Sequence, residues 1–265
     1  MNYLFTIKPM AFVNSFLSVY HLSPLQWFLV LFAAMIIGMS KAGIGSVSII
    51  SVSIWAWIFG GRMSTGMILP MLIFADILAV RYYKRHALWD HLKKLLPWIA
   101  AGVLLAVVCG QYINDQLFKR LMAFIILISL FALFWWEKRP MAKVPYHWLF
   151  AGSMGLATGF TSMIGNLAGG FSTVYFISMQ VLKDNFIGTA AWMFFILNSF
   201  KLPFHILVWK TVSVSSVTLN VMMIPAIAVG FYTGVFLVKK LNEQRFRKVI
   251  LWLTTISSLL ILLDL

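Results

Sequence analysis

Two clusters of glycine and hydroxyl-bearing residues interrupt long apolar stretches of this sequence. In the first half, hydrogen-bond donors are available at Ser40, Lys41, Gly43, Gly45, Ser46 and Ser48. In the second half, they are available at Thr161, Ser162, Gly165, Asn166, Gly169, Gly170, Ser172 and Thr173. Neither cluster contains an acidic residue. Because neutral donors beside the start of a helix favour negative charge, the clusters indicate an anion site and argue against a carboxylate-lined cation pathway.

Two charged residues lie deep inside apolar stretches, where charge is costly and marks function. Lys41 either anchors an anion directly, or it is accommodated by snorkelling or by pairing with a carboxylate such as Asp76. Asp76 is a candidate proton carrier or charge partner of Lys41. Asn198 occupies the matching position of the second half; it cannot titrate, but it is a candidate substrate-binding residue.

Structural alternatives exist for several of these residues. The glycines could serve only close helix packing, and the serines could serve only as helix caps. Two clusters at matching positions, each with polar neighbours, favour the binding site. Lys201 and His205 follow Asn198 by one and two helical turns. They either line an outer vestibule or anchor the span at the membrane interface, and we expect the anchoring role.

The elements that must position these residues are membrane helices. Of the 265 residues, 62% are hydrophobic and only 11% are charged, whereas soluble domains are about a quarter charged. Apolar runs of about 17–25 residues, enough to cross a bilayer, recur along the chain. The net charge of +14 comes from short basic clusters between these runs, so it indicates membrane orientation rather than nucleic-acid binding. A single cysteine, Cys109, excludes a disulfide framework.

The apolar stretches divide the chain into two similar halves. We assign an amphipathic lead-in, a first membrane repeat, a basic connector and a second membrane repeat to residues 1–23, 24–138, 139–146 and 147–265. The spans expected after the broken stretches are 64–82, 95–113, 119–136, 185–204, 213–238 and 246–263. An offset of 122 residues aligns Gly43 with Gly165, Gly66 with Gly188 and Asp76 with Asn198. The order and spacing of the elements therefore predict an internal repeat.

The distribution of lysine and arginine among the loops predicts how the two halves are oriented in the membrane. Loops 81–94 and 239–248 and the connector are strongly basic, which favours the cytoplasmic side for all three. Segment 147–180 then starts and ends inside. Its 34 residues would make a helix of roughly 50 Å against a core of about 30 Å, so it must be a hairpin. The same reasoning makes 25–60 a hairpin that starts and ends outside.

The expected fold is therefore an all-α polytopic membrane protein made of two inverted repeats. Each repeat is a broken-helix hairpin followed by three transmembrane helices, and both chain termini lie outside. Inverted repeats with interrupted helices are a recurring plan of transporters, in which the substrate binds near the midplane where the breaks meet.

At these residues the chain resembles the TauE/SafE family of sulfite and organosulfonate exporters. The resemblance rests on residues 38–45, 159–166, 186–192 and 198–203, with further matches at 68–76 and 82–86. It implies export of sulfite, or of an organosulfonate such as sulfoacetate, across the bacterial inner membrane. The chain departs from the commoner glycine-run form of the first break, having Lys41 and Ser46 there.

We therefore expect a secondary transporter that works by alternating access and holds an anion between the two hairpin tips. Proton coupling through Asp76 and facilitated diffusion both remain open. No catalytic residue, metal or cofactor is expected. The expected partners are a small anion and the lipid bilayer, with no nucleic acid, and the sequence does not decide between a monomer and a homodimer. Two other classes stay open: a membrane assembly subunit without transport activity and an intramembrane lipid-modifying enzyme.

Overall fold

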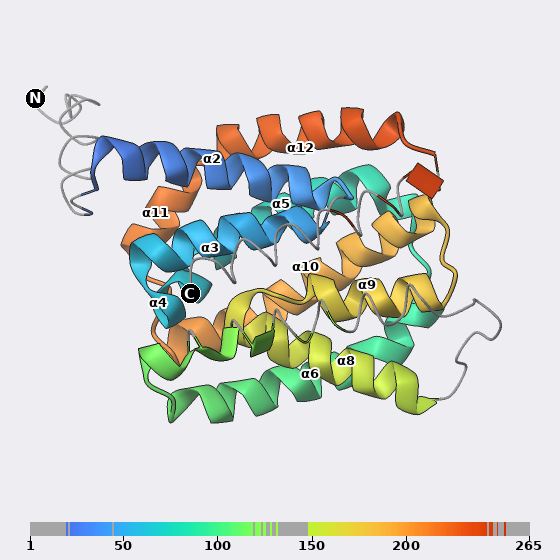
Figure 1. Cartoon of the computed structure of the whole chain (residues 1–265), viewed down its shortest axis with the longest axis horizontal. Coiled ribbons are helices and arrows are strands. Elements are labelled where there is room, and N and C mark those ends of the chain that lie inside the picture. Colours follow the sequence, from blue (N-terminus) through green and yellow to red (C-terminus); the bar gives the residue numbers. More distant parts are fainter. Residues whose placement is uncertain are drawn as a thin grey trace, which may run out of the picture.

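The computed structural model describes residues 22–43, 45–118 and 148–242, with positions 20, 120–122, 124–125, 128, 131, 244–245, 248 and 252. These residues form helices and no strand (Figure 1). The first half contains α2 (Pro24–Lys41), η1 (Gly45–Val47), α3 (Ser48–Phe59), α4 (Gly61–Met67), α5 (Leu69–Tyr83), η2 (Lys84–His86) and α6 (Trp89–Gln111). The second half contains α8 (Trp148–Gly165), α9 (Gly169–Ser178), α10 (Lys183–Leu207), α11 (Val214–Met222) and α12 (Ile224–Lys239).

Each half begins with two helices that reverse direction at the polar cluster. The helices α2 and α3 pack together, and Ser51 Oγ donates a hydrogen bond to Ala33 O at 3.0 Å across the pair. The second pair consists of α8 and α9. Figure 1 shows the first pair entering from the left-hand end and the second from the right-hand end. The apolar stretches 25–60 and 147–180 are thus each broken into two helices, as the sequence predicted.

The spans expected at 64–82 and 213–238 are each two helices in the structure. The axes of α4 and α5 meet at 40°, and those of α11 and α12 meet at 50°. Pro70 and Pro225 stand in the first turn of α5 and of α12. Proline lacks an N–H and clashes with the preceding turn, so it starts a helix more readily than it continues one.

Within the described ranges, three helices are long and apolar enough to cross a membrane: α2, α6 and α10. The number rises to five if each bent pair is one span. The expected spans 119–136 and 246–263 and the lead-in 1–23 lie mostly outside the described residues, and the connector 139–146 lies wholly outside them.

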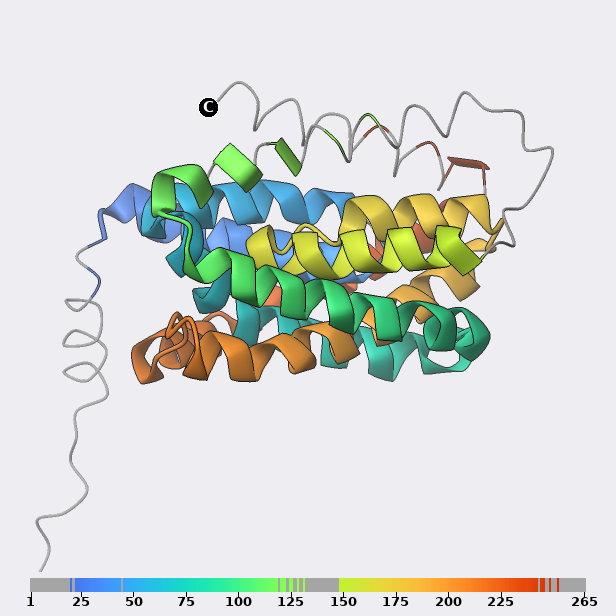
Figure 2. The ribbon, with the colours of Figure 1, turned by 90° about the horizontal axis from the view of Figure 1, so that it is seen from below.

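The first helix of each half packs against a helix of the other half. In Figure 1, α2 lies beside α12, and in Figures 1 and 2, α6 lies beside α8. Glycines allow the two helices of each crossing to approach each other closely. A Cβ on Gly38 would overlap Ile227 O, and a Cβ on Gly159 would overlap Ile99 O. Both crossings thus depend on a glycine that faces a backbone carbonyl of the partner helix.

Two helices of these crossings, α6 and α12, share a short sequence motif that the offset of 122 residues does not align. Residues 97–102 of α6 and 225–230 of α12 both read Pro-x-Ile-Ala-x-Gly, 128 positions apart. The last glycine of each motif, Gly102 or Gly230, faces a backbone carbonyl of the partner helix. An alignment of the halves with one fixed offset therefore does not show this match.

The helices α5 and α10 occupy matching places in the two halves and pack against each other. Asn198 Nδ2 donates to Asp76 Oδ2 at 2.6 Å, and these two residues are the pair that the sequence alignment equates. If a twofold axis relates the halves, equivalent residues can touch only beside that axis. The contact marks where such an axis would pass.

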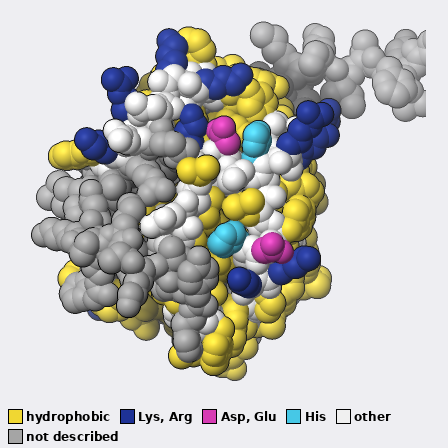
Figure 3. All heavy atoms as spheres, turned by 90° about the vertical axis from the view of Figure 1, so that its right-hand side faces the viewer, with side chains coloured by type: hydrophobic (Ala, Val, Ile, Leu, Met, Phe, Trp, Pro, Cys, Tyr) yellow, Lys and Arg dark blue, Asp and Glu magenta, His cyan; other side chains and the backbone are white. Residues whose placement is uncertain are grey.

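The loops with the most basic residues meet at one end of the molecule. Leu88 N donates to Thr189 Oγ1 at 2.9 Å, which joins the loop after α5 to the start of α10. Lys183 Nζ donates to Leu241 O at 2.7 Å, which joins the start of α10 to the end of α12. Lysine and arginine side chains gather around this end (Figure 3). Loops 81–94 and 239–248 thus share one end, as the charge pattern predicted.

The glycine crossings yield a stability prediction. Gly159→Ala should lower the free energy of unfolding by about 1–3 kcal/mol, because the new methyl group is forced into the backbone of α6. Gly45→Ala is the matched control, since a Cβ there meets no described atom within 4 Å. Thermal unfolding in detergent measures both variants. Equal midpoints would show that the α6–α8 crossing does not depend on the missing side chain.

Candidate functional site

Three polar side chains meet in the buried centre of the helix bundle. Lys41 Nζ, at the end of α2, forms an ion pair with Asp76 Oδ1 of α5 at 2.8 Å. Asn198 of α10 binds the other oxygen of the same carboxylate. The side chain of Lys41 is 9% exposed and that of Asp76 is fully buried. Lys41 is thus paired with a carboxylate, which is one of the alternatives that the sequence left open. Its ammonium also lies 4.2 Å from the ring centroid of Phe194.

Lys201 is a second buried cation and holds the tip of the second hairpin. Its Nζ donates to Ser162 O at 3.0 Å, to Ser162 Oγ at 2.9 Å and to Asn166 Oδ1 at 2.7 Å. Asn166 Nδ2 in turn donates to Thr65 O at 3.0 Å. Because Lys201 only donates and the Thr65 carbonyl only accepts, these contacts fix the orientation of the Asn166 amide.

His205 lies one turn beyond Lys201 on the same face of α10, and both residues are fully buried. His205 Nδ1 lies 2.8 Å from Thr211 Oγ1. His205 Nε2 has no hydrogen-bond partner among the described residues. The expectation that Lys201 and His205 anchor the span at the membrane interface is therefore wrong. Both side chains face inward because the hairpin tip and the loop after α10 supply hydrogen-bond partners there.

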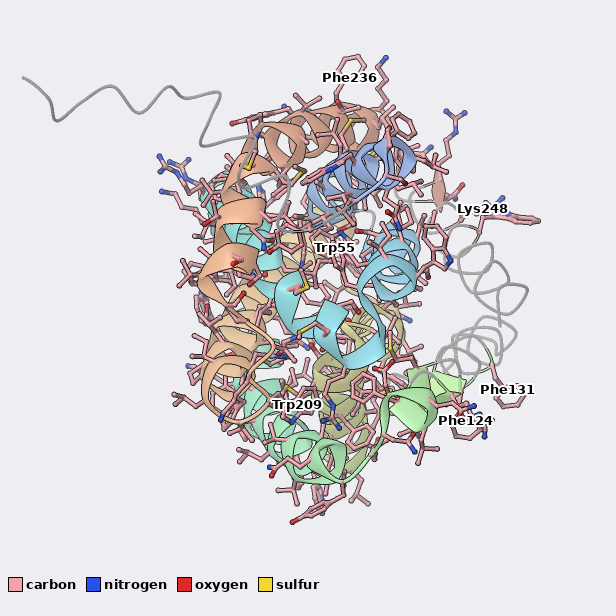
Figure 4. The ribbon with its side chains drawn as sticks, turned by 90° about the vertical axis from the view of Figure 1, so that its left-hand side faces the viewer. Trp55, Phe124, Phe131, Trp209, Phe236 and Lys248 are labelled. Carbon is pink, nitrogen blue, oxygen red and sulfur yellow. The ribbon has the colours of Figure 1, made fainter. Side chains whose placement is uncertain are left out.

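An aromatic and cationic layer covers His205 at the end where α10 finishes. The rings of His205 and Trp209 lie 5.2 Å apart, and Figure 4 shows Trp209 between this end of α10 and α6. Trp209 Nε1 donates to Val107 O at 3.3 Å. The guanidinium of Arg62 lies 5.7 Å from the Trp209 ring and donates to Gly110 O. The polar face of α10 is thus covered at this end by packed side chains.

A cavity of about 50 Å³ lies between the two hairpin tips. Its polar lining comprises Ser40, Lys41, Ser48, Ser162, Asn166, Ser172, Thr173 and Asn198. Glycines of both tips line it as well, and Phe176, Phe186 and Phe194 form part of its apolar wall. Among the described residues that line it, Lys41 is the single charged one and none is acidic. The cavity is large enough for a small ion or a few water molecules.

The backbone of both tips is shaped for a tight reversal. Gly43 has φ 121° and Asn166 has φ 55°, which is the left-handed region; glycine enters it at no steric cost and asparagine tolerates it. Each tip therefore contains one residue with positive φ, Gly43 in the first and Asn166 in the second. In the described structure, α3 and α9 begin without a side-chain cap. Uncapped helix starts present N–H groups to an anion.

The family to which this chain belongs follows from comparison with known protein families. Residues 30–261 match the family described as sulfite exporter TauE/SafE. The chain belongs to the TauE/SafE family. No curated protein and no solved structure matches the chain. Because the match covers both hairpins and most of the chain, it supports a membrane transporter as the coarse function of this TauE/SafE protein.

The structure gathers most of the predicted site residues of this TauE/SafE protein around one cavity. Those that line it are Ser40, Lys41, Gly43, Gly45, Ser162, Asn166, Gly169, Ser172 and Asn198. Thr161, Gly165, Gly170 and Asp76 do not line it. Thr161 Oγ1 is bonded within α8 to Ala157 O at 2.8 Å, and Asp76 lies behind Lys41. The side chain of Ser46 lies outside the described part of the structure.

Sequence reasoning missed the central position of Lys201. The available signal was its spacing: Asn198, Lys201 and His205 follow one another at three and four residues, which places them on one face of a helix. A polar face of that length inside an apolar span points to the protein interior more than to the interface. The three phenylalanines of the cavity wall carry no such signal, because apolar residues are common throughout the spans.

Proposed function

We propose that this protein is a secondary transporter that moves a small sulfur oxyanion, sulfite or an organosulfonate, outward across the inner membrane. The observation that carries the proposal is the cavity between two opposed hairpin tips, which is lined by hydroxyl groups, an amide and the ammonium of Lys41. Membership of the sulfite exporter family supports a sulfur oxyanion as the substrate class.

The arrangement of helices supports alternating access between inverted repeats. The hairpins α2–α3 and α8–α9 enter from opposite ends, and α5 packs on α10 beside the cavity (Figure 1). The tips approach closely, since a Cβ on Gly169 would lie 3.8 Å from Gly45 O. Rocking of one repeat against the other would expose this meeting point first to one side of the membrane and then to the other.

The chemistry of the lining supports an anion. An oxyanion accepts hydrogen bonds at every oxygen, and the lining offers hydroxyl donors together with uncapped helix starts. A bound anion would also meet the ammonium of Lys41, whose Asp76 partner is withdrawn behind it. Charge-assisted hydrogen bonds of this kind are roughly twice as strong as neutral ones.

Purified protein in liposomes tests the proposal. We expect radiolabelled sulfite to move down its gradient at a rate well above that of protein-free liposomes. A labelled neutral sugar reports leakage and serves as the control. Absence of flux for sulfite and for organosulfonates would overturn the substrate class. Absence of flux for every anion tried, with folded protein, would favour the assembly subunit instead.

Topology can be tested independently of transport. We propose that loops 81–94 and 239–248 lie in the cytoplasm and that both termini lie outside. A reporter fused to the C-terminus that is active only in the periplasm is expected to be active. A second reporter inserted near Lys93 should give the opposite result. A cytoplasmic C-terminus would contradict the inverted arrangement.

A further inference from the structure

Asn220 of α11 bonds to both sides of the break between α4 and α5. Its Oδ1 accepts a hydrogen bond from Met71 N at 3.1 Å, and its Nδ2 donates to Met67 O at 2.7 Å. Nδ2 also donates to Ser216 O in the preceding turn of α11. Because Met71 N only donates and Met67 O only accepts, these contacts fix the orientation of the amide. Asn220 is 4% exposed and does not line the cavity.

The two backbone groups that Asn220 binds would be partners in an uninterrupted helix. An α-helix joins the N–H of each residue to the carbonyl four positions earlier, which pairs residue 71 with residue 67. Pro70 beside Met71 has no N–H, so the ladder is already weakened at this point. A side chain inserted into the ladder is a known cause of sharp kinks, and α4 and α5 meet here at 40°. Asn220, from the second half, therefore helps to set the bend of a broken span in the first half.

This bend lies between two connections to the cavity. On the α4 side, Thr65 O accepts the hydrogen bond from Asn166 Nδ2 at 3.0 Å, and Asn166 lines the cavity. On the α5 side, Asp76 pairs with Lys41, which lines the cavity from the other hairpin tip. The angle between α4 and α5 thus contributes to the relative positions of the two tips.

We infer that Asn220 is a positioning residue for the anion site, because it fixes the bend through which α4 and α5 hold the two hairpin tips. This role rests on the proposed transport of anions, and it adds a residue that lies outside the cavity lining. The alternative is a role in stability alone. Loss of stability would change the amount of folded transporter, whereas loss of positioning would change the KM for the anion.

Flux of radiolabelled sulfite into liposomes, measured over a range of concentrations, separates these two roles. Asn220→Leu has a similar shape but no hydrogen-bonding group. We expect its KM for sulfite to rise by about tenfold, the factor that corresponds to one hydrogen bond, while the maximal rate per folded transporter stays close to that of wild type. Asn220→Gln keeps the amide and should recover most of the lost affinity. Thr218→Val on α11 is the matched control and should leave KM unchanged, because the Thr218 hydroxyl donates within α11 to Val214 O at 3.0 Å.

A double variant tests the route from Asn220 to the cavity. Asn166→Gly removes the amide that binds Thr65 O and keeps a residue that tolerates the left-handed backbone of this position. If Asn220 acts through Asn166, adding Asn220→Leu to Asn166→Gly should raise KM by much less than about tenfold. Effects on KM that multiply in full would contradict this route.

A wild-type KM in folded Asn220→Leu protein would overturn the inference and leave the proposed transport of anions intact. If Asn220→Leu does not fold, Asn220→Asp decides, since its carboxylate keeps the acceptor for Met71 N and offers no donor to Met67 O. A raised KM in that variant supports the positioning role, and an unchanged KM overturns it. If wild-type protein moves neither sulfite nor an organosulfonate, the proposed function fails and the positioning role fails with it.

Discussion

Lys41→Met is expected to reduce anion flux by about 100-fold. The substitution removes the charged group that lines the cavity, and a hydrogen bond to a charged group is worth about 1.5–3 kcal/mol. It also leaves the buried carboxylate of Asp76 with Asn198 as its remaining described partner. Removal of one partner of a buried ion pair lowers the free energy of unfolding by about 3–5 kcal/mol, so the melting temperature in detergent should fall as well.

The double variant Lys41→Met, Asp76→Asn separates these two effects. It removes both members of the ion pair, so stability should return toward the wild-type value. Flux should stay low, because the ammonium that meets the anion is still missing. If the double variant transports as fast as wild type, Lys41 serves Asp76 alone and does not bind the substrate. That result would contradict the site proposed between the hairpin tips.

Lys201→Met is expected to have the second largest effect, again near 100-fold on flux. The ammonium joins α10 to the reversal between α8 and α9 through Ser162 and Asn166. Without it, the partly buried amide oxygen of Asn166 loses the Lys201 donor, whereas the Ser162 carbonyl still accepts from Asn166 N at 2.9 Å. An unsatisfied acceptor costs about 1–3 kcal/mol, and the contact that holds the hairpin tip to α10 would be lost.

The control for this prediction is Lys94→Met on the exposed surface of α6. Surface substitutions usually change stability by less than about 0.5 kcal/mol, and flux should be unaffected. An interface anchor at position 201 would give a result close to that of Lys94→Met. Liposome flux and thermal unfolding, measured on the same preparations, therefore distinguish an interior tether from an interface anchor.

The broken helices and the meeting of the basic loops could be predicted because both depend on local composition. A stretch of 34 residues cannot cross the bilayer as one helix, and glycine at position 43 marks a reversal that other residues resist. The pairing of Lys41 with Asp76 was one of the alternatives left open, since an isolated charge inside a bundle needs a partner.

The inward position of Lys201 could not be read from the same rules. Taken alone, a lysine two turns from a span end is compatible with both the interface and the interior; the spacing to Asn198 and His205 favours the interior, but the partners Ser162 and Asn166 lie 39 and 35 residues away. The motif that α6 and α12 share, 128 positions apart, was hidden for a similar reason. It stands out only when the crossings show that Gly102 and Gly230 each face a backbone carbonyl of the partner helix.

The most direct test of the proposed anion site is to locate a bound anion. Selenite is a heavier oxyanion of the same shape as sulfite, and its selenium can be found by anomalous diffraction from crystals of the protein. We expect a peak between the hairpin tips, with an oxygen within about 3 Å of Lys41 Nζ and close to the first turn of α9. A peak elsewhere in the bundle, with the Lys41 side chain facing an empty cavity at saturating selenite, would contradict the proposed site.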